Sequence, residues 1–128
     1  MSVKVLIITN NPMVHEKFPD ACFLDGSLKD VLIKTRDYIH KGYVLLSHPM
    51  AGSIKPNETP YRTVVLNDKP AVQDMSLDFK SLEIIENAIM TVDKFLPLNK
   101  YKRPEVLKDF QLVDLSLLVC ALDSLQMF

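Results

Sequence analysis

The sequence predicts a small α/β fold: a three-layer sandwich with a mostly parallel four-stranded sheet, strand order 2-1-3-4, and helices on both faces. Residues 3–9 are almost continuously apolar and β-branched, which is typical of a strand covered on both sides. Strand patterns then alternate with helical patterns along the chain, as in α/β proteins. A length of 128 residues fits one domain spanning residues 1–128.

Composition excludes several classes of partner. Apolar residues make up 48% of the chain and charged residues 24%, which is ordinary for a globular protein. The 15 basic and 16 acidic side chains nearly cancel, so we expect neither nucleic acid nor a membrane surface as a partner. The chain begins directly with a strand pattern and has no apolar run of about 18 residues, so we expect a cytoplasmic protein.

The first half of the chain carries clear start and stop signals. Asn11 is placed to cap a short helix over residues 12–18, and residues 21–24 read as a short edge strand. Ser27 then caps a second helix, which ends at Gly42. Since the most apolar strand comes first, we place it centrally, and right-handed connections put these two helices on opposite faces.

The second half continues the alternation. Residues 43–46 and 63–66 are predicted as the third and fourth strands. A periodic apolar stripe predicts a helix over residues 79–95, and a last helix runs from Pro104 to about residue 125. Together these elements complete the predicted sandwich.

The last helix is apolar on two sides. One stripe consists of Phe110, Val113, Leu117 and Ala121, and the other of Leu112, Leu115, Val119 and Leu122. Such a helix needs two partners. We expect the sheet and a second subunit, giving a homodimer through this helix; the alternative is a helix buried between the sheet and a neighbour in the same chain.

The loop over residues 47–61 is the predicted functional site. Ligands bind beyond the carboxyl ends of strands in open α/β sheets, where the strand order reverses. In the predicted order this crevice lies between the first and third strands, so Asn10 and Asn11 should meet Ser47 and His48. A long loop without regular structure is also commonly functional.

His48 is the candidate catalytic residue, because histidine ionises near neutral pH and can act as a general acid or base. The alternative is a loop histidine that only bonds to the backbone. No metal site is predicted, since Cys22 and Cys120 do not form a C-x-x-C motif and read as buried free thiols. No cofactor is predicted either, because dinucleotide-binding and P-loop spacings are absent.

The rest of the loop contains groups of the kind that bind an anion. Gly52 and Ser53 can present backbone N–H groups and a hydroxyl, and Lys55 an ammonium. A plain turn with a solvated lysine explains them equally well. Asn57 can form a turn that presents Glu58, which either pairs with a nearby cation or acts as a base.

Three segments carry a resemblance to a known family. They are Ile-Thr-Asn-Asn-Pro-Met-Val (8–14), His-Lys-Gly-Tyr-Val-Leu-Leu-Ser-His-Pro-Met-Ala-Gly-Ser-Ile-Lys-Pro-Asn-Glu-Thr-Pro-Tyr-Arg (40–62) and Leu-Asp-Phe-Lys-Ser-Leu-Glu-Ile-Ile-Glu (77–86). The chain resembles the GrdX family over about residues 5–96, most specifically within residues 47–61.

The resemblance implies a setting rather than a reaction. GrdX proteins accompany the glycine, sarcosine and betaine reductase systems of anaerobic amino-acid-fermenting bacteria. The family brings no assigned reaction, catalytic residue or cofactor, so the site residues above rest on the fold argument alone.

Three functions remain open from the sequence. The first is an accessory or regulatory protein that binds a small anionic metabolite or a reductase component through loop 47–61. The second is a small enzyme that uses His48 as acid or base, with Lys55 steadying an anionic substrate. The third is a non-catalytic docking module in which the loop is a rigid surface for another protein.

Overall fold

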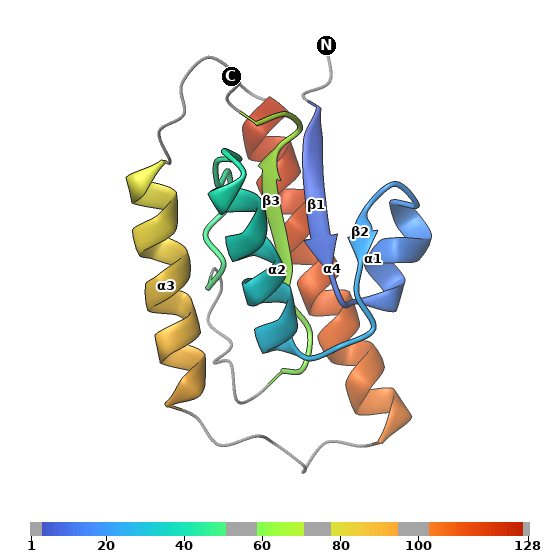
Figure 1. Ribbon diagram of the computed structural model, residues 1–128. Coiled ribbons are helices and arrows are strands. Elements are labelled where there is room, and N and C mark those ends of the chain that lie inside the picture. The colour runs from blue at the N-terminus through green and yellow to red at the C-terminus, as the bar shows by residue number, and fades with distance from the viewer. Residues whose placement is uncertain (1–3, 51–58, 71–77, 95–102, 127–128) are drawn as a thin grey trace.

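The computed structural model describes residues 4–50, 59–70, 78–94 and 103–126. Figure 1 shows the arrangement of its helices and strands. In chain order the elements are β1 (Val5–Thr9), α1 (Pro12–Lys17), β2 (Cys22–Phe23), α2 (Leu28–His40), β3 (Thr63–Asn67), α3 (Phe79–Asp93) and α4 (Pro104–Gln126).

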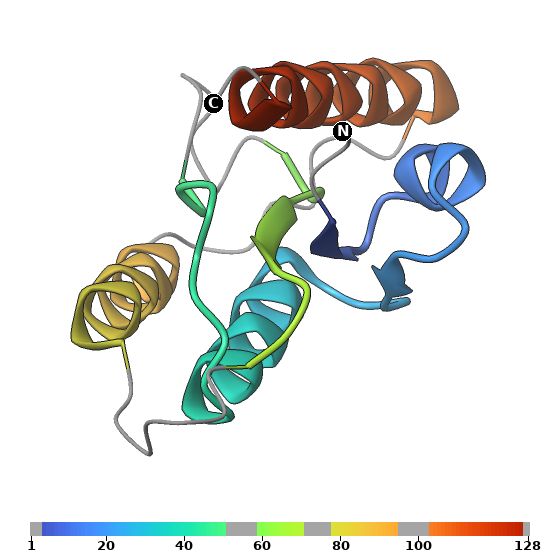
Figure 2. The same ribbon diagram turned by 90° about the horizontal axis from the view of Figure 1, so that it is seen from above.

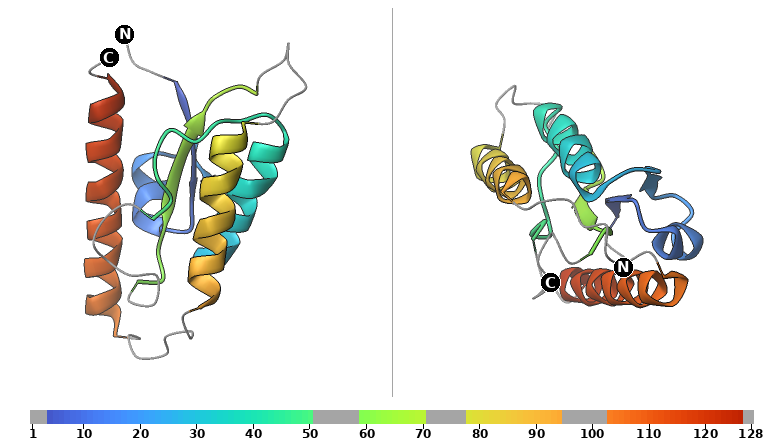
Figure 3. Two further views of the ribbon diagram at one scale, coloured as in Figure 1. Left: turned by 90° about the vertical axis from the view of Figure 1, so that its left-hand side faces the viewer. Right: turned by 90° about the horizontal axis from the view of Figure 1, so that it is seen from below.

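The predicted three layers are present. Helices α2 and α3 pack together on one face of the sheet, and α1 and α4 pack together on the other. Figures 2 and 3 show the sheet between these two helix layers. The prediction that the first two helices lie on opposite faces is therefore confirmed.

Local signals in the sequence place the early helices. The side chain of Asn11 accepts a hydrogen bond from the backbone N–H of Met13 and so caps α1. Ser27 and Asp30 form a reciprocal capping box at the start of α2, which satisfies two backbone donors that the helix leaves open. Gly42 has φ 103°, the left-handed conformation that glycine adopts readily after a helix.

The predicted four-stranded, mostly parallel sheet is wrong. The sheet has three strands in the order β2-β1-β3, and β1 pairs parallel with β2 but antiparallel with β3. A parallel return would need a crossover, usually a helix, and none lies between α2 and β3 among the described residues. The chain therefore turns back on itself, and the last strand takes the place beside β1 that was predicted for residues 43–46.

Residues 43–46 run along the outer edge of β3 without forming a strand. They pair with it through an antiparallel bridge between Leu45 and Leu66, flanked by backbone hydrogen bonds from Asn67 N–H to Val44 O at 3.1 Å and from Leu46 N–H to Val65 O at 2.8 Å. The backbone N–H of Leu45 points to the other side and donates to the hydroxyl of Ser81 on α3, at 3.0 Å. The segment is therefore held between β3 and α3.

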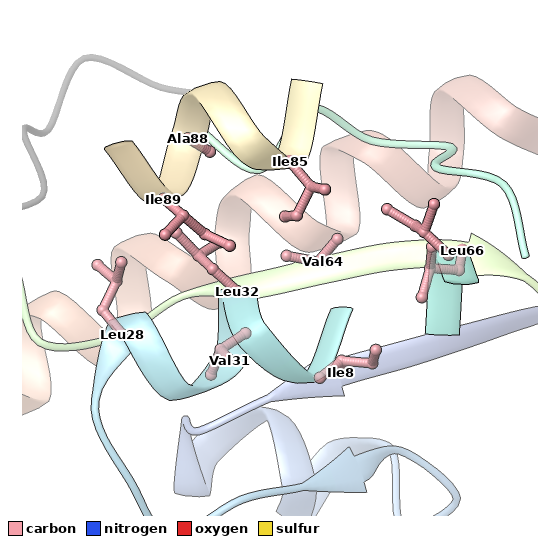
Figure 4. Close-up of a cluster of buried hydrophobic side chains, with 10 residues drawn as sticks. Ile8, Leu28, Val31, Leu32, Val64, Leu66, Ile85, Ala88 and Ile89 are labelled. Carbon is pink, nitrogen blue, oxygen red and sulfur yellow. The ribbon is translucent and has the colours of Figure 1, made fainter. Parts of the chain in front are cut away.

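Two apolar clusters hold the layers together. The larger lies between the sheet and the α2/α3 layer, and Figure 4 shows Ile8, Val64 and Leu66 of the strands facing Leu32 and Ile85 of the helices. The smaller lies under α1 and α4, and its buried members are Ile7, Val14, Val65 and Leu118. Because neighbouring strand residues face opposite sides, β1 and β3 each supply both clusters.

Helix α4 is buried along only part of the two predicted stripes, since Leu115 and Leu122 pack against the smaller cluster. Asp114 and Leu118 are its buried residues, whereas Leu112 and Val113 are 55% and 40% exposed. Cys120 on the same helix is exposed rather than buried, and Cys22 is half-buried. No helix in the described part of the chain has the length and apolar character needed to cross a membrane.

Candidate functional site

A buried chain of hydrogen bonds links the end of β1 to α4. The backbone N–H of Asn11 donates to Thr9 Oγ1 at 2.9 Å, and Thr63 Oγ1 donates to Asp114 Oδ2 at 2.6 Å. The two threonine hydroxyls lie 2.8 Å apart. Since the Thr63 proton goes to Asp114, Thr9 is the donor to Thr63, and every bond in the chain points toward the carboxylate.

Asn11 also reaches α4 directly. Its Nδ2 atom donates to Asp114 Oδ2 at 3.0 Å and to the backbone oxygen of Gln111 at 2.9 Å. Gln111 in turn donates to the hydroxyl of Tyr61 at 2.8 Å. One fully buried asparagine therefore caps α1 and fixes α4 against the segment that enters β3.

Asn10 fixes the backbone that carries Arg62. Its Oδ1 atom accepts the N–H of Arg62 at 2.9 Å, and its Nδ2 atom donates to the backbone oxygens of Pro60 at 2.8 Å and Gly26 at 3.0 Å. These bonds join three segments of the chain around the end of β1. The side chain of Arg62 is thereby held at the start of β3, where it is 4% exposed.

Burial shifts the acid–base behaviour of both charged residues. The pKa of Asp114 is raised above its ordinary 3.8, mainly because burial penalises the carboxylate, although Thr63, Asn11 and Arg62 act in the opposite sense. The pKa of Arg62 is lowered by burial, and the charge of Asp114 opposes that shift. Burial therefore disfavours the charged form of each side chain, and the charge of the other residue partly offsets that effect.

A small pocket of about 30 Å³ lies between β3, α4 and the segment after residue 46. Arg62 and Asp114 both line it, as do Ser47 and His48. The remaining lining residues are Thr63, Val65, Leu117, Leu118 and Ala121. The pocket thus has two charged groups and a mostly apolar remainder, an arrangement that suits a small ligand with few polar contacts.

The structure brings only some of the predicted site residues to this pocket. Ser47 lies beside β3, where its Oγ accepts the N–H of Val65 at 2.9 Å, and His48 is exposed at the pocket. The Nδ1 atom of His48 accepts the N–H of Met50 at 3.0 Å, which leaves Nε2 as the ring atom for a ligand or proton. Asn10 and Asn11 lie behind the pocket as supports of Arg62 and Asp114.

The other predicted residues lie outside the described parts of the chain. These are Gly52, Ser53, Lys55, Asn57 and Glu58. Within the described parts, no three histidine, cysteine or acidic side chains are grouped as a metal site would need.

Sequence reasoning missed the residues at the centre of the site: Arg62, Thr63 and Asp114. A signal for Asp114 was present, because an acidic residue at this position lies in one helical stripe with Phe110 and Leu118. Arg62 directly precedes a buried strand, which is also an unusual place for a charge. A lone charge within an apolar pattern was thus the informative feature.

The family model described as GrdX-like protein matches residues 6–123. The chain belongs to the GrdX-like protein family. The match includes α4 almost to its end, and so it covers Asp114 as well as Arg62. No curated protein and no solved structure matches this GrdX-like chain.

Proposed function

We propose that this GrdX-like protein is a cytoplasmic accessory component of glycine, sarcosine and betaine reductase systems, and that it binds a small anionic metabolite or a reductase component. Membership of the GrdX-like family supports the association with these reductase systems. The position of Arg62 supports the ligand: its side chain is 4% exposed and lines the same pocket as Ser47 and His48. A cation surrounded by protein attracts an anion more strongly than a cation in water.

Acetate, a minimal anion, tests this proposal. In an NMR titration we expect saturable shifts at the backbone amides of Ser47, His48 and Arg62, because these residues line the pocket. Arg62→Met keeps the length of the side chain but removes the charge, so the shifts should disappear.

The matched control is Arg36→Met, since Arg36 lies on α2 in an ion pair with Glu86 and away from the pocket. Its shifts should equal those of the unaltered protein. Shifts that persist in Arg62→Met, or no saturable shift in the unaltered protein, would contradict anion binding at Arg62.

An enzymatic role for His48 is the second candidate. It is favoured by the position of His48 at a pocket that also contains a buried carboxylate, Asp114. A histidine with an accessible Nε2 and a nearby acid is a workable acid–base pair. The third candidate, a docking module, would use the same surface around residues 47–50 and 59–61 without chemistry.

The exposed side of α4 supports a homodimer. Leu112 and Val113 are large apolar residues that remain 55% and 40% exposed in the single chain. A second copy packing along this side would remove them from water.

A further inference from the structure

Apolar contacts alone do not explain which side of α4 packs on the sheet. Residues 110–122 contain a single charged residue, Asp114, and the two stripes predicted for this helix consist of apolar residues throughout. The side that packs lies between these stripes and buries Asp114 together with Leu118, at 7% and 4% exposed. Burial of apolar surface would favour a stripe without a charge, so another interaction must select the observed side.

Hydrogen bonds to the packed side of α4 provide this selection. The Oδ2 atom of Asp114 accepts from Asn11 Nδ2 at 3.0 Å and from Thr63 Oγ1 at 2.6 Å. On the preceding turn, the backbone oxygen of Gln111 accepts from the same Asn11 Nδ2 at 2.9 Å. Asn11 follows β1 and Thr63 begins β3, so two neighbouring strands hold the carboxylate.

A different orientation of α4 would break these bonds together. Turning the helix about its axis by one residue, about 100° at about 3.6 residues per turn, would bring Val113 to the place of Asp114. Sliding it by one turn, about 5.4 Å, would bring Leu118 there instead. Either movement would leave Thr63 and the fully buried Asn11 without their acceptor on α4, which is costly.

We propose that Asp114 determines which side of α4 packs on the sheet, and that it does so as a positioning residue through Asn11 and Thr63. Buried polar groups fix the register of packed helices in coiled coils in the same way. The choice leaves Leu112 and Val113 at the surface, at 55% and 40% exposed. The proposal concerns the packing of the helix, so it holds whether or not the pocket binds a ligand.

Asp114→Leu tests the proposal, because it removes the acceptor and makes α4 apolar on every side over residues 110–122. Orientations of similar free energy are populated to similar extents. We therefore expect a second set of methyl signals in NMR spectra, while NOE cross-peaks between Leu118 and Val65, which share the smaller cluster, fall to about half. Asp123→Leu makes the same substitution at an exposed position of α4 and should leave these cross-peaks unchanged.

A second experiment removes the donors and keeps Asp114. Asn11→Ser retains a residue that caps α1 but shortens the side chain that reaches α4, and Thr63→Val removes the hydroxyl. With both substitutions the carboxylate loses its two donors, so α4 should turn away and the cross-peaks between Leu118 and Val65 should be lost. Asp114→Asn keeps a side-chain oxygen for both donors and should retain the cross-peaks at full intensity.

A single set of signals with undiminished cross-peaks in Asp114→Leu would overturn the proposal. Reduced cross-peaks in Asp114→Asn would overturn it as well, because this variant keeps the acceptor. If Asp114→Leu does not fold, the variant with Asn11→Ser and Thr63→Val decides, and undiminished cross-peaks there would show that apolar contacts alone orient α4.

Discussion

Asp114 occupies the side of α4 that packs against the sheet, where most neighbours are apolar. Burial raises the pKa of this carboxyl above 3.8 in the folded protein. Its stabilising contribution is therefore complete below that value and is lost as the pH rises through the folded pKa. The hydrogen bonds from Asn11 and Thr63 limit this loss, because they stabilise the charged form.

The raised pKa of Asp114 predicts how the stability of the protein, relative to Asp114→Asn, changes with pH. The asparagine of this variant does not titrate. The free energy of unfolding of the unaltered protein, minus that of the variant, should decrease between about pH 3 and pH 7. Urea denaturation at several pH values measures the difference. Asp123→Asn, on an exposed position of the same helix, is the matched control for a changed charge on α4. A difference that increases with pH would contradict the raised pKa.

His48 gives a second prediction at the scale of one residue. Its ring is exposed, and its one hydrogen bond among the described residues is local, to Met50. His48→Ala should therefore change the melting temperature of the free protein little, while abolishing the thermal shift produced by acetate.

His40→Ala, at the exposed end of α2, should retain that thermal shift and is the control. A clear loss of stability without ligand would mean that His48 is structural, and our assignment of this residue would then fail.

At the scale of elements, the position of Arg62 is fixed by hydrogen bonds from the short connection that follows β1. Asn10→Ala would remove the bonds to Gly26, Pro60 and Arg62 and leave buried backbone groups without their partner. We expect a loss of about 2–3 kcal/mol in the free energy of unfolding by urea denaturation. Asn87→Ala, with an exposed side chain on α3, should change it by less than about 0.5 kcal/mol. An equal effect of the two substitutions would show that Asn10 is not a structural clamp.

The elements that the sequence predicted well have local causes. Asn11, Ser27 and Gly42 act within a few residues of their own position, so their caps could be recognised without knowing the fold. The order of the strands depends instead on which segments meet across the sheet. Residues 43–46 have the composition of a strand, but they pair through one bridge with the outer edge of β3 and do not lie beside β1. No local pattern reveals that placement.

The sequence likewise predicted two residues of the pocket and missed the two charged ones. Ser47 and His48 line the pocket because they follow a segment that runs beside β3, although that segment is not the predicted strand. Arg62 and Asp114 are 52 residues apart in sequence and meet only because α4 packs over β3. Contacts of this kind depend on how the elements pack, and no fixed number of residues between the two positions indicates them in the sequence.

At the scale of the whole molecule, the exposed residues of α4 predict self-association. Sedimentation at micromolar concentration should give a species of twice 14.6 kDa. Leu112→Glu should shift it to the single chain, because a charge in an apolar interface is costly. Glu105→Ala, near the start of the same helix, is the control and should leave the dimer intact. A single-chain species of the unaltered protein would remove the dimer from the proposal.

The origin of Asp114 in α4 also affects when the pocket can exist during synthesis. Helix α4 is the last element of the fold, and it carries the acidic wall of the pocket and much of its apolar lining. A nascent chain that has emerged only as far as α3 holds Arg62 and His48 but lacks the residue opposite them. Ligand binding would therefore require α4 to be in place over β3, and a ligand would stabilise only chains in which this helix has already been made and docked.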